Sequence, residues 1–312
     1  MMKLRAVSRL QGNNRALKDG RVSVRGAELV FEDVPVLVDA FRRMVRGLEF
    51  DVCEMALTTY ICARAHGKRF TAIPVFLVRA FHHGAIFRRA GDSLRSPADL
   101  AGRRVGVNRG YTVTTGVWAR GVLQEEYGVD PREVTWVCSG DEHVEQFVPP
   151  ANVSRLPKGT SLLDALNQGD IDAAIGLESG GDGVEPLIDQ PVAAGFAALE
   201  RRGHYPINHL VVIKDELLEH RPGLAADIFV AFAESKQRYV DDLLAGRIEN
   251  PSDVDRLHLE VSRRIGDPLP YGIEPNRLML ETLIGHAVAQ DILPESVPVD
   301  TLFAATTRNL RG

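Results

Sequence analysis

Short runs of apolar, often β-branched residues alternate along this chain with longer stretches in which apolar positions recur every three or four residues. The short runs are typical of strands and the longer stretches of helices. Strands are predicted at residues 28–31, 50–52, 105–107, 135–137 and 171–175, and a mostly extended stretch at 70–88. Helices are predicted at residues 33–47, 60–66, 112–127, 161–169, 222–240 and 275–289. This alternation indicates an α/β fold built of layers.

Residues that favour helix ends set several of these boundaries. Asp33, followed by a proline in the first turn, predicts a helix start. Ser161, three residues before Asp164, fits a capping-box pattern. Gly128 and Gly169 predict helix ends, because glycine readily adopts the left-handed conformation that closes a helix.

The order of the elements favours two lobes. A chain of 312 residues is long enough for two lobes with separate cores. We expect residues 1–97 and 204–312 to form lobe one and residues 98–203 to form lobe two. Two crossings between the lobes would act as a hinge, with a small-molecule cleft lined by loops at the strand ends.

Composition narrows the classes of function and location. Apolar residues make up 45% and charged residues 25%, as in ordinary soluble globular proteins. The net charge of −5 offers no basic surface for nucleic acid or an anionic membrane. The first residues lack the apolar core of a signal peptide, and no apolar run approaches the ~20 residues that span a bilayer. We therefore expect a cytoplasmic protein, and the composition leaves open whether it forms a homo-oligomer.

The cysteines give no sign of a metal centre. Cys53, Cys62 and Cys138 show neither metal-ligand nor CxxC spacing, so reduced thiols are the simplest interpretation. The adjacent His82 and His83 would point to opposite faces of a strand, so this pair alone does not make a metal site. We expect no bound metal.

The segment from Arg79 to Arg88 holds the densest group of side chains suited to acid–base and anion-binding chemistry. On an unbroken strand Arg79 and His83 would share one face, and His82 and Arg88 the other. The first pair could offer a carboxylate-binding guanidinium beside an imidazole that titrates near neutral pH. The alternative is that both histidines are ordinary polar residues at a strand end.

Further candidates lie where predicted strands begin or end. Glu54 follows a strand and precedes a helix, where a carboxylate either favours the helix dipole or acts as an acid or base in a cleft. Thr58 could donate a hydrogen bond to a ligand oxygen or simply cap the helix. His209 stands at the start of an apolar strand near the second crossing, in either a structural or a catalytic role. Asn13 is a further substrate-binding candidate.

Residues 109–115 lie where the first strand of lobe two gives way to a helix. Backbone N–H groups and the hydroxyls of Thr112 and Thr114, beside Arg109, make a natural anion site at such a helix start. The segment lacks the Gly-Lys-Ser/Thr ending of a nucleotide-binding loop, and a well-capped helix is the alternative. The glycine-rich acidic loop at 176–186 is either a gate that faces the ligand or a solvated surface loop.

Several short motifs occur in one order along nearly the whole chain. They lie at residues 50–55, 74–76, 117–121, 169–173, 206–207 and 267–274, together with Arg79, Phe81, His83, His209, Asn276 and Arg277. This set resembles the 4,5-dihydroxyphthalate decarboxylase family. The resemblance implies a two-lobed, periplasmic-binding-protein-like (type II) α/β fold. It also implies a cofactor-free decarboxylase that converts a hydroxylated aromatic acid to protocatechuate and CO2.

The resemblance further implies roles for the candidate residues. His83 would be the general acid, His209 or Glu54 the partner of the phenolic proton, and Arg79 the anchor of the retained carboxylate. The expected partner is a small aromatic carboxylate, held by the threonines and by Asn13 and Arg109.

Six positions depart from the family pattern: Ala56, Gly84, Glu178, Asn208, Leu210 and Leu269. Serines are usual where this chain has Ala56 and Gly84, and an arginine is common near Glu178. Two other functions therefore stay open. One is a related cytoplasmic lyase for a different aromatic or enol acid. The other is a non-catalytic solute-binding protein for a small organic acid, which needs an anchor but no proton-transfer group.

Overall fold

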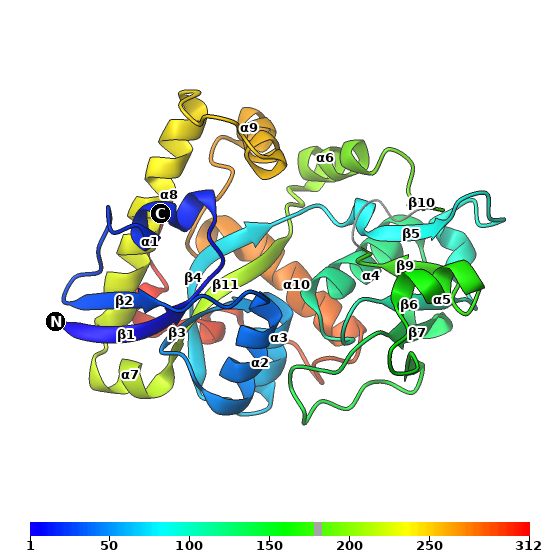
Figure 1. The fold of residues 1–312 in the computed structure, drawn as a ribbon, viewed down its shortest axis with the longest axis horizontal. Coiled ribbons are helices and arrows are strands. Elements are labelled where there is room, and N and C mark those ends of the chain that lie inside the picture. The colour runs from blue at the N-terminus through cyan, green and yellow to red at the C-terminus, as the bar shows by residue number, and fades with distance from the viewer. Residues whose placement is uncertain (178–182) are drawn as a thin grey trace. The chain divides into compact units, whose positions relative to one another are not determined.

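The computed structural model describes residues 1–177 and 183–312 and divides the chain into two compact units (Figure 1). Unit one comprises Met1–Arg79, Ile207–Leu280 and Val297–Gly312, and so holds both termini. Unit two comprises Ala80–Pro206 and Glu281–Ser296. Each unit is built around its own β-sheet.

Unit one has a five-stranded sheet in the order β2–β1–β3–β11–β4. Its strands are β1 (Met2–Val7), β2 (Ala27–Phe31), β3 (Val52–Ala56), β4 (Phe70–Arg79) and β11 (Ile207–Lys214). β1 is parallel to β2 and β3, whereas β11 is antiparallel to β3 and β4. The central strand β3 is buried at all five positions, as expected for a strand that is covered on both faces.

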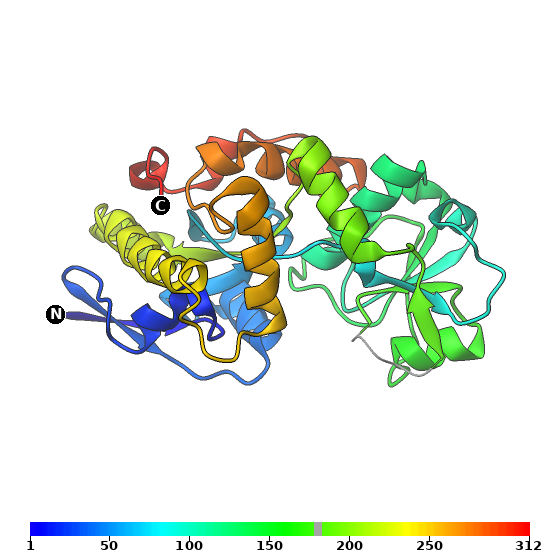
Figure 2. The same ribbon diagram turned by 90° about the horizontal axis from the view of Figure 1, so that it is seen from above.

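Unit one also contains helices. They are α1 (Arg15–Lys18), α2 (Leu37–Gly47), α3 (Leu57–Ala65), α7 (Asp215–His220), α8 (Leu224–Leu244) and α9 (Asp253–Ile265). α2 and α3 contact β3, and α8 contacts α1 and β4 (Figures 1 and 2). The predicted stripe on α2 is confirmed, because Leu37, Phe41 and Val45 are buried. Short 3-10 turns complete the unit: η1 (Gly12–Asn14), η5 (Glu274–Asn276), η6 (Val299–Leu302) and η7 (Ala305–Thr307).

Unit two has a six-stranded sheet in the order β10–β5–β9–β6–β7–β8. Its strands are β5 (Ile86–Arg89), β6 (Arg104–Val107), β7 (Thr135–Cys138), β8 (Val153–Arg155), β9 (Ala173–Ile175) and β10 (Val184–Pro186). β9, β6, β7 and β8 run parallel to one another, and β5 is antiparallel to β9 and β10. The parallel strands are linked by helical or irregular connections, as parallel pairing requires.

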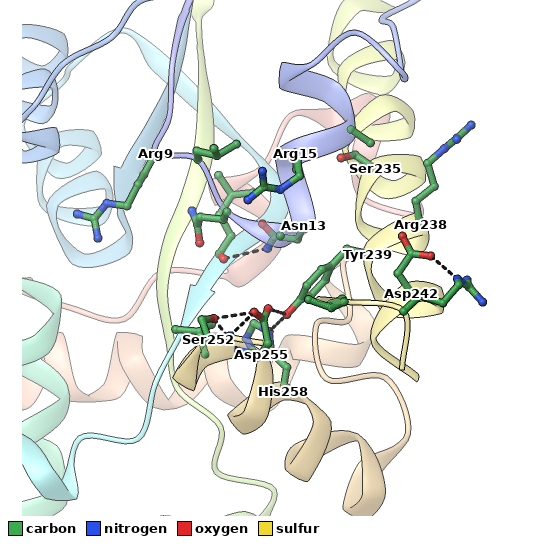
Figure 3. A pocket seen from close by; sticks show the side chains of 18 of the residues that line it. Arg9, Asn13, Arg15, Ser235, Arg238, Tyr239, Asp242, Ser252, Asp255 and His258 are labelled. Carbon is green, nitrogen blue, oxygen red and sulfur yellow. Dashed lines mark hydrogen bonds and ion pairs between the residues drawn. The ribbon is translucent and has the colours of Figure 1, made fainter. Parts of the chain in front are cut away.

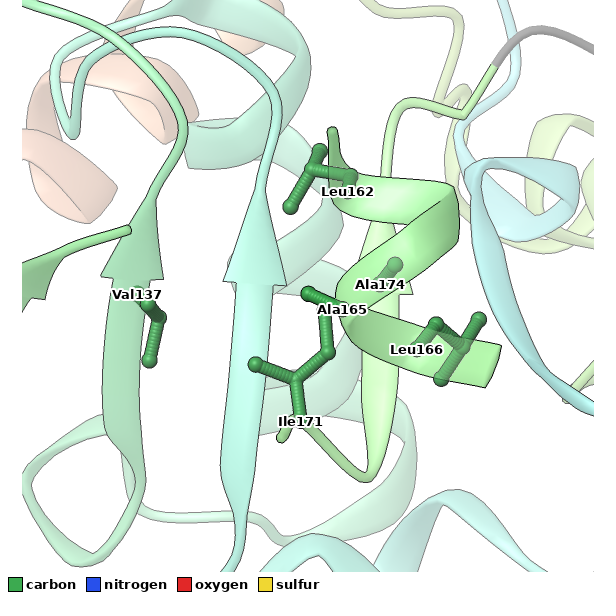
Figure 4. Packing of buried hydrophobic residues seen from close by; sticks show 6 residues of the cluster. All are labelled: Val137, Leu162, Ala165, Leu166, Ile171 and Ala174. Carbon is green, nitrogen blue, oxygen red and sulfur yellow. The ribbon is translucent and has the colours of Figure 1, made fainter. Parts of the chain in front are cut away.

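The helices of unit two are α4 (Thr114–Tyr127), α5 (Leu162–Gln168) and α6 (Pro191–Arg202), with turns η2 (His83–Ala85), η3 (Pro97–Leu100) and η4 (Pro131–Glu133). A further helix, α10 (Arg277–Ala289), begins in unit one, and its residues from Glu281 onward belong to unit two. Figure 4 shows the cluster through which α5 packs on the sheet: Val137, Leu162, Ala165, Leu166, Ile171 and Ala174. Within the described ranges, none of the helices is both long and apolar enough to cross a bilayer.

Several predicted helix ends are confirmed. The Ser161 side chain accepts a backbone hydrogen bond at 3.0 Å at the start of α5. Helices α4 and α5 end at Gly128 and Gly169, both with positive φ. The predicted start at Asp33 is wrong, because the backbone is still extended before Leu37.

The units differ from the expected lobes. Residues 80–97 were expected in lobe one, but they belong to unit two because β5 pairs with β9 and β10. Residues 281–296 also belong to unit two, and the second crossing falls after Pro206. The stretch at 70–88 is mostly extended but is not one unbroken strand, so the shared face of Arg79 and His83 is not formed: β4 ends at Arg79, and η2 interrupts the chain before β5.

Candidate active site

An enclosed acid–base pair in unit one joins Glu54 of β3 to His209 of β11, which is the neighbouring strand. Glu54 Oε1 lies 2.6 Å from His209 Nδ1. Glu54 is 1% exposed, and its Oε2 accepts the backbone N–H of Arg9 at 2.9 Å. Burying a carboxylate is costly unless it is paired and hydrogen-bonded, and both conditions are met here. Two of the predicted catalytic residues therefore come together in unit one.

This pairing fixes the tautomer of His209. A carboxylate only accepts hydrogen bonds, so Nδ1 donates its hydrogen bond to Glu54, and Nε2 is the acceptor nitrogen of the neutral ring. The ring of Phe41 lies edge-on, with 5.3 Å between the ring centroids, and restricts rotation of the imidazole. The His209 side chain is 18% exposed, so part of it remains accessible. An imidazole oriented by a buried carboxylate in this way is suited to general acid–base catalysis.

Unit one also contains a cavity of about 710 Å³ (Figure 3). Its walls come from the loop after β1, from η1, from the end of β4, and from α8, α9 and their connection. Arg9 and Gln11 line the cavity and also bond Glu54, Gln11 through its Nε2 at 3.5 Å. The cavity is in the size range of sites for small organic ligands.

Two predicted substrate-binding residues, Arg79 and Asn13, line this cavity, and both are buried. The Arg79 guanidinium donates to the side chain of Asn276 and, at 3.4 Å, to the carbonyl of Pro270. Asn13 Nδ2 donates to the carbonyl of Leu77 at 3.0 Å. Both side chains are thus held by partners within unit one.

Another part of the cavity contains a hydrogen-bonded group that the sequence did not indicate. Tyr239 of α8 donates its hydroxyl proton to Asp255 Oδ1 at 2.6 Å and lies 2.9 Å from His258 Nδ1, both on α9 (Figure 3). Burial lowers the pKa of His258 to about 4, so the ring is neutral at pH 7. No local sequence signal marks this group, because α8 and α9 are brought together only by folding.

Positive side chains outnumber negative ones around the cavity. Of the described residues that line it, three are acidic, Asp242, Glu249 and Asp255. Six are arginines: Arg9, Arg15, Arg21, Arg79, Arg238 and Arg247. Arg21 and Arg238 are paired with Asp19 and Glu234, which do not line the cavity, so the excess of positive charge is small. A positive charge at a concave surface attracts anions, which fits the expected aromatic carboxylate.

His83 lies in unit two, whereas Arg79 lies in unit one. The His83 side chain is fully buried in η2, and its Nε2 is 3.0 Å from Glu126 Oε1 of α4. Burial alone would raise the pKa of Glu126, but the hydrogen bond and charge of His83, with the charge of Arg202, lower it. His83 is therefore part of an internal ion-pair network in unit two, and its catalytic role stays a prediction.

Two more buried histidines flank Trp118 in unit two. The ring centroids of His204 and His286 lie 5.3 and 5.5 Å from that of Trp118. Burial, reinforced by the charge of Arg202, lowers the pKa of His204 to about 3 and that of His286 to about 4. Both rings are neutral at pH 7 and contribute to packing.

The predicted anion site at residues 109–115 already holds a carboxylate of this chain. Glu142 accepts the hydroxyl proton of Thr112 at 2.6 Å and its N–H at 3.2 Å, and it also accepts the N–H of Tyr111. Helix α4 begins only at Thr114, which is buried, and the Arg109 side chain is exposed. Substrate binding by Thr112, Thr114 and Arg109 stays a prediction.

The remaining candidates are Thr58 and the loop at residues 176–186. Thr58 is fully buried in α3 of unit one. Glu178 and the rest of 178–182, the middle of the predicted gate, lie outside the described residues. Within the described ranges, no group of three or more histidine, cysteine or acidic side chains is arranged to hold a metal ion.

Comparison with solved structures defines the class of fold. The periplasmic aliphatic sulphonate binding protein SsuA from Escherichia coli matches with a TM-score of 0.57 at 13% sequence identity, over 99% of this chain and 100% of that chain. The chain therefore has a periplasmic-binding-protein-like α/β fold, as the sequence predicted. At this identity the match establishes the fold alone.

Comparison of sequences defines the family. A 4,5-dihydroxyphthalate decarboxylase from Comamonas testosteroni is 32% identical over 310 residues, 93% of this chain and 92% of that protein. One from Pseudomonas putida is 37% identical over 173 residues, 52% of this chain and 65% of that protein. No family model matches the sequence. On the first of these matches, this chain belongs to the 4,5-dihydroxyphthalate decarboxylase family, and the resemblance found from its motifs is confirmed.

Proposed function

We propose that this chain is a carboxy-lyase that removes one carboxylate from 4,5-dihydroxyphthalate and releases protocatechuate and CO2. The observation that carries the proposal is its 32% identity, over 93% of its length, to the decarboxylase from Comamonas testosteroni. The Glu54–His209 pair supports it, because Arg9 and Gln11, which bond Glu54, also line a cavity that contains several arginines.

The reaction replaces a carboxylate by a proton on the ring. Each carboxylate-bearing carbon of 4,5-dihydroxyphthalate has a hydroxyl para to it. Removal of the phenolic proton lets that oxygen donate electrons, which helps the ring carbon to accept a proton. The carbon–carboxylate bond then breaks, its electron pair restores the aromatic ring, and CO2 leaves. The phenolic proton returns to oxygen, so the reaction balances without an oxidant or a reductant.

In this scheme Nε2 of His209 receives the phenolic proton, and the Glu54 carboxylate stabilises the resulting imidazolium. The proton donor to the ring carbon is a separate role. The family resemblance assigns it to His83, whose Nε2 contacts Glu126. The two histidines are therefore tested separately.

The test is incubation of the purified protein with 4,5-dihydroxyphthalate, without added metal or cofactor, and chromatographic measurement of protocatechuate. We expect turnover by the wild type and a loss of about 10²–10⁴-fold in His209→Ala, the range for a positioned acid or base. The same loss is expected in His83→Ala. His220→Ala, at an exposed position in α7, is the matched control and should keep full turnover.

Other results would contradict the proposal. Thermal stabilisation of the wild type by the compound without product would favour a solute-binding protein. Neither stabilisation nor product would favour a lyase for a different aromatic or enol acid. Normal turnover by His83→Ala would remove His83 from the reaction and leave His209 as the tested acid–base group.

We also propose that the protein works in the cytoplasm. Its three cysteines, Cys53, Cys62 and Cys138, are free and buried, which suits a reducing compartment. Fractionation of cells that produce the full-length protein tests this location, and recovery in the periplasmic fraction would contradict it.

A further inference from the structure

We propose that Arg9 is the residue that binds the retained carboxylate of the substrate, the role first assigned to Arg79. This inference rests on the proposed function and names the group that positions the substrate against Glu54 and His209. Arg9 has no place among the motifs of the sequence, and three observations on unit one lead to it.

The first observation is the attachment of Arg9 to the acid–base pair. Its N–H donates to Glu54 Oε2 at 2.9 Å, while Oε1 of the same carboxylate holds His209. The Arg9 backbone is thus one hydrogen bond away from the group that orients the imidazole. A carboxylate held by the Arg9 side chain would lie in the same neighbourhood as the reacting ring.

The loop that carries Arg9 is held firmly. The side chain of buried Asn14 donates from Nδ2 to the Arg9 carbonyl at 2.8 Å and to Ser8 Oγ at 3.0 Å. Its Oδ1 accepts the N–H of Gln11 at 2.8 Å. These bonds hold the Arg9 carbonyl, the Ser8 side chain and the Gln11 N–H, so the backbone from which the Arg9 side chain extends is positioned before a ligand binds.

The second observation is that the Arg9 side chain is available. It is exposed and lines the cavity, and among the described residues its guanidinium has no ion-pair or hydrogen-bond partner. In Figure 3 it extends away from the group formed by Tyr239, Asp255 and His258. By contrast, Arg247 of the same cavity is paired with Asp242.

The third observation is that Arg79 is already occupied. It is 5% exposed and donates to Asn276 and to the Pro270 carbonyl. Asn276 in turn donates to the carbonyls of Pro270 and Gly272, each at 2.8 Å. Arg79 therefore braces the segment 270–276 through Nη2, and its guanidinium is almost entirely shielded from solvent.

Together these observations indicate the class of ligand. A planar guanidinium receives a carboxylate through two parallel hydrogen bonds, which fixes the orientation of an aromatic ring as well as its position. An aromatic dicarboxylate can lose one carboxylate while the other stays on Arg9. Arg9 would thus favour substrates that carry a second carboxylate on the ring carbon next to the one that loses CO2.

The experiment compares Arg9→Gln, Arg9→Lys and Arg15→Gln with the wild type. Arg15 is the matched control, because it is also exposed, lines the same cavity and carries the same charge. The binding probe is phthalate, which has both carboxylates and no hydroxyl, measured by isothermal titration calorimetry. Steady-state kinetics with 4,5-dihydroxyphthalate give kcat and KM, and thermal unfolding reports stability.

Arg9→Gln is expected to weaken phthalate binding and to raise KM by about 10–100-fold, with a smaller change in kcat and an unchanged Tm, because it loses a charge-assisted pair at the surface of the cavity. Arg9→Lys should lie between the wild type and Arg9→Gln, because lysine keeps the charge but not the fork. Arg15→Gln should change both constants by less than about threefold, as expected for a charge removed away from the contact.

Wild-type binding or KM in Arg9→Gln would overturn the assignment, as would an equal effect of Arg15→Gln, which would indicate only the general charge of the cavity. The binding probe separates this inference from the proposed function. A wild type that binds phthalate through Arg9 but forms no protocatechuate would overturn the reaction and support the anchor. Turnover that does not depend on Arg9 would overturn the anchor alone.

Discussion

At the scale of single residues, the carboxylate of Glu142 occupies the anion site that the sequence predicted at residues 109–115. Its carboxylate accepts the N–H groups of Tyr111 and Thr112 and the Thr112 hydroxyl, the same kinds of donor that were expected to bind an anion. Gly110 makes this approach possible, since a Cβ there would lie 2.7 Å from the Glu142 carboxylate. The segment therefore binds a carboxylate as predicted, but that carboxylate belongs to Glu142 of the same chain and not to a ligand.

Removing that carboxylate should destabilise unit two. Glu142→Ala leaves buried donors without an acceptor, and hydrogen bonds to a charged group contribute about 1.5–3 kcal/mol. We expect a loss of at least about 2 kcal/mol in the free energy of unfolding by urea. Acetate at tens of millimolar should restore part of it, because the ion can occupy the site of the Glu142 carboxylate. Glu295→Ala, at an exposed position in unit two, should show neither effect. A stable Glu142→Ala variant that ignores acetate would contradict this account.

Residue types were easier to predict than their partners. Glu54 and His209 were identified singly, but they are 155 positions apart, and only the pairing of β3 with β11 brings them together. The same holds for Glu142, which no local pattern linked to Thr112. Arg9 was missed because a lone arginine in a loop carries no signal until its backbone contact with Glu54 is known.

At the scale of elements, hydrophobic periodicity predicted those that bury a clear apolar face. α2 was found because its stripe faces the core, whereas α5 was found from its end signals, Ser161 and Gly169. α9 was missed because it buries only His258, Val261 and Ser262, so its sequence reads as a polar segment. That omission also hid Asp255 and His258 on the cavity wall. The break between β4 and β5 was missed because extended and turn conformations share residues such as histidine and glycine.

The contact between β6 and α5 should be sensitive to a single methyl group. A Cβ at Gly106 would lie 2.5 Å from Ile171 Cδ1 and 2.6 Å from Leu162 Cδ2. We expect Gly106→Ala to cost about 1–3 kcal/mol, the usual penalty for overpacking a core. Adding Ile171→Val removes one of the clashing atoms. The double variant should therefore lose less free energy of unfolding than the sum of the losses of the two single variants. Additive losses in urea denaturation would contradict the proposed contact.

At the scale of the whole molecule, the two units have separate sheets and need not unfold together. The only two tryptophans, Trp118 and Trp136, both belong to unit two. Tryptophan fluorescence therefore reports the unfolding of unit two, whereas circular dichroism reports both units. This separation allows the effect of pH on unit two to be measured within the intact chain.

Acid should destabilise unit two through His204 and His286. Burial, reinforced by the positive charge of Arg202, lowers the pKa of His204 to about 3 and that of His286 to about 4, although Glu125 lies 3.4 Å from His286 Nε2. In the unfolded chain both rings bind a proton near pH 6.5. The unfolded state therefore binds more protons below that pH, so stability is full above about pH 7 and falls as the pH falls towards 4.

Each histidine should cost about 2 kcal/mol at pH 5, since each pH unit below 6.5 is worth about 1.4 kcal/mol while the folded ring stays neutral. We expect His204→Leu to reduce the loss between pH 8 and pH 5 by about that amount when urea unfolding is followed by tryptophan fluorescence. His220→Leu, at an exposed position in unit one, should leave the loss unchanged. If His204→Leu loses as much stability between pH 8 and pH 5 as the wild type, protonation of His204 does not cause the acid destabilisation. Protonation of carboxylates in unit two would then have to cause it.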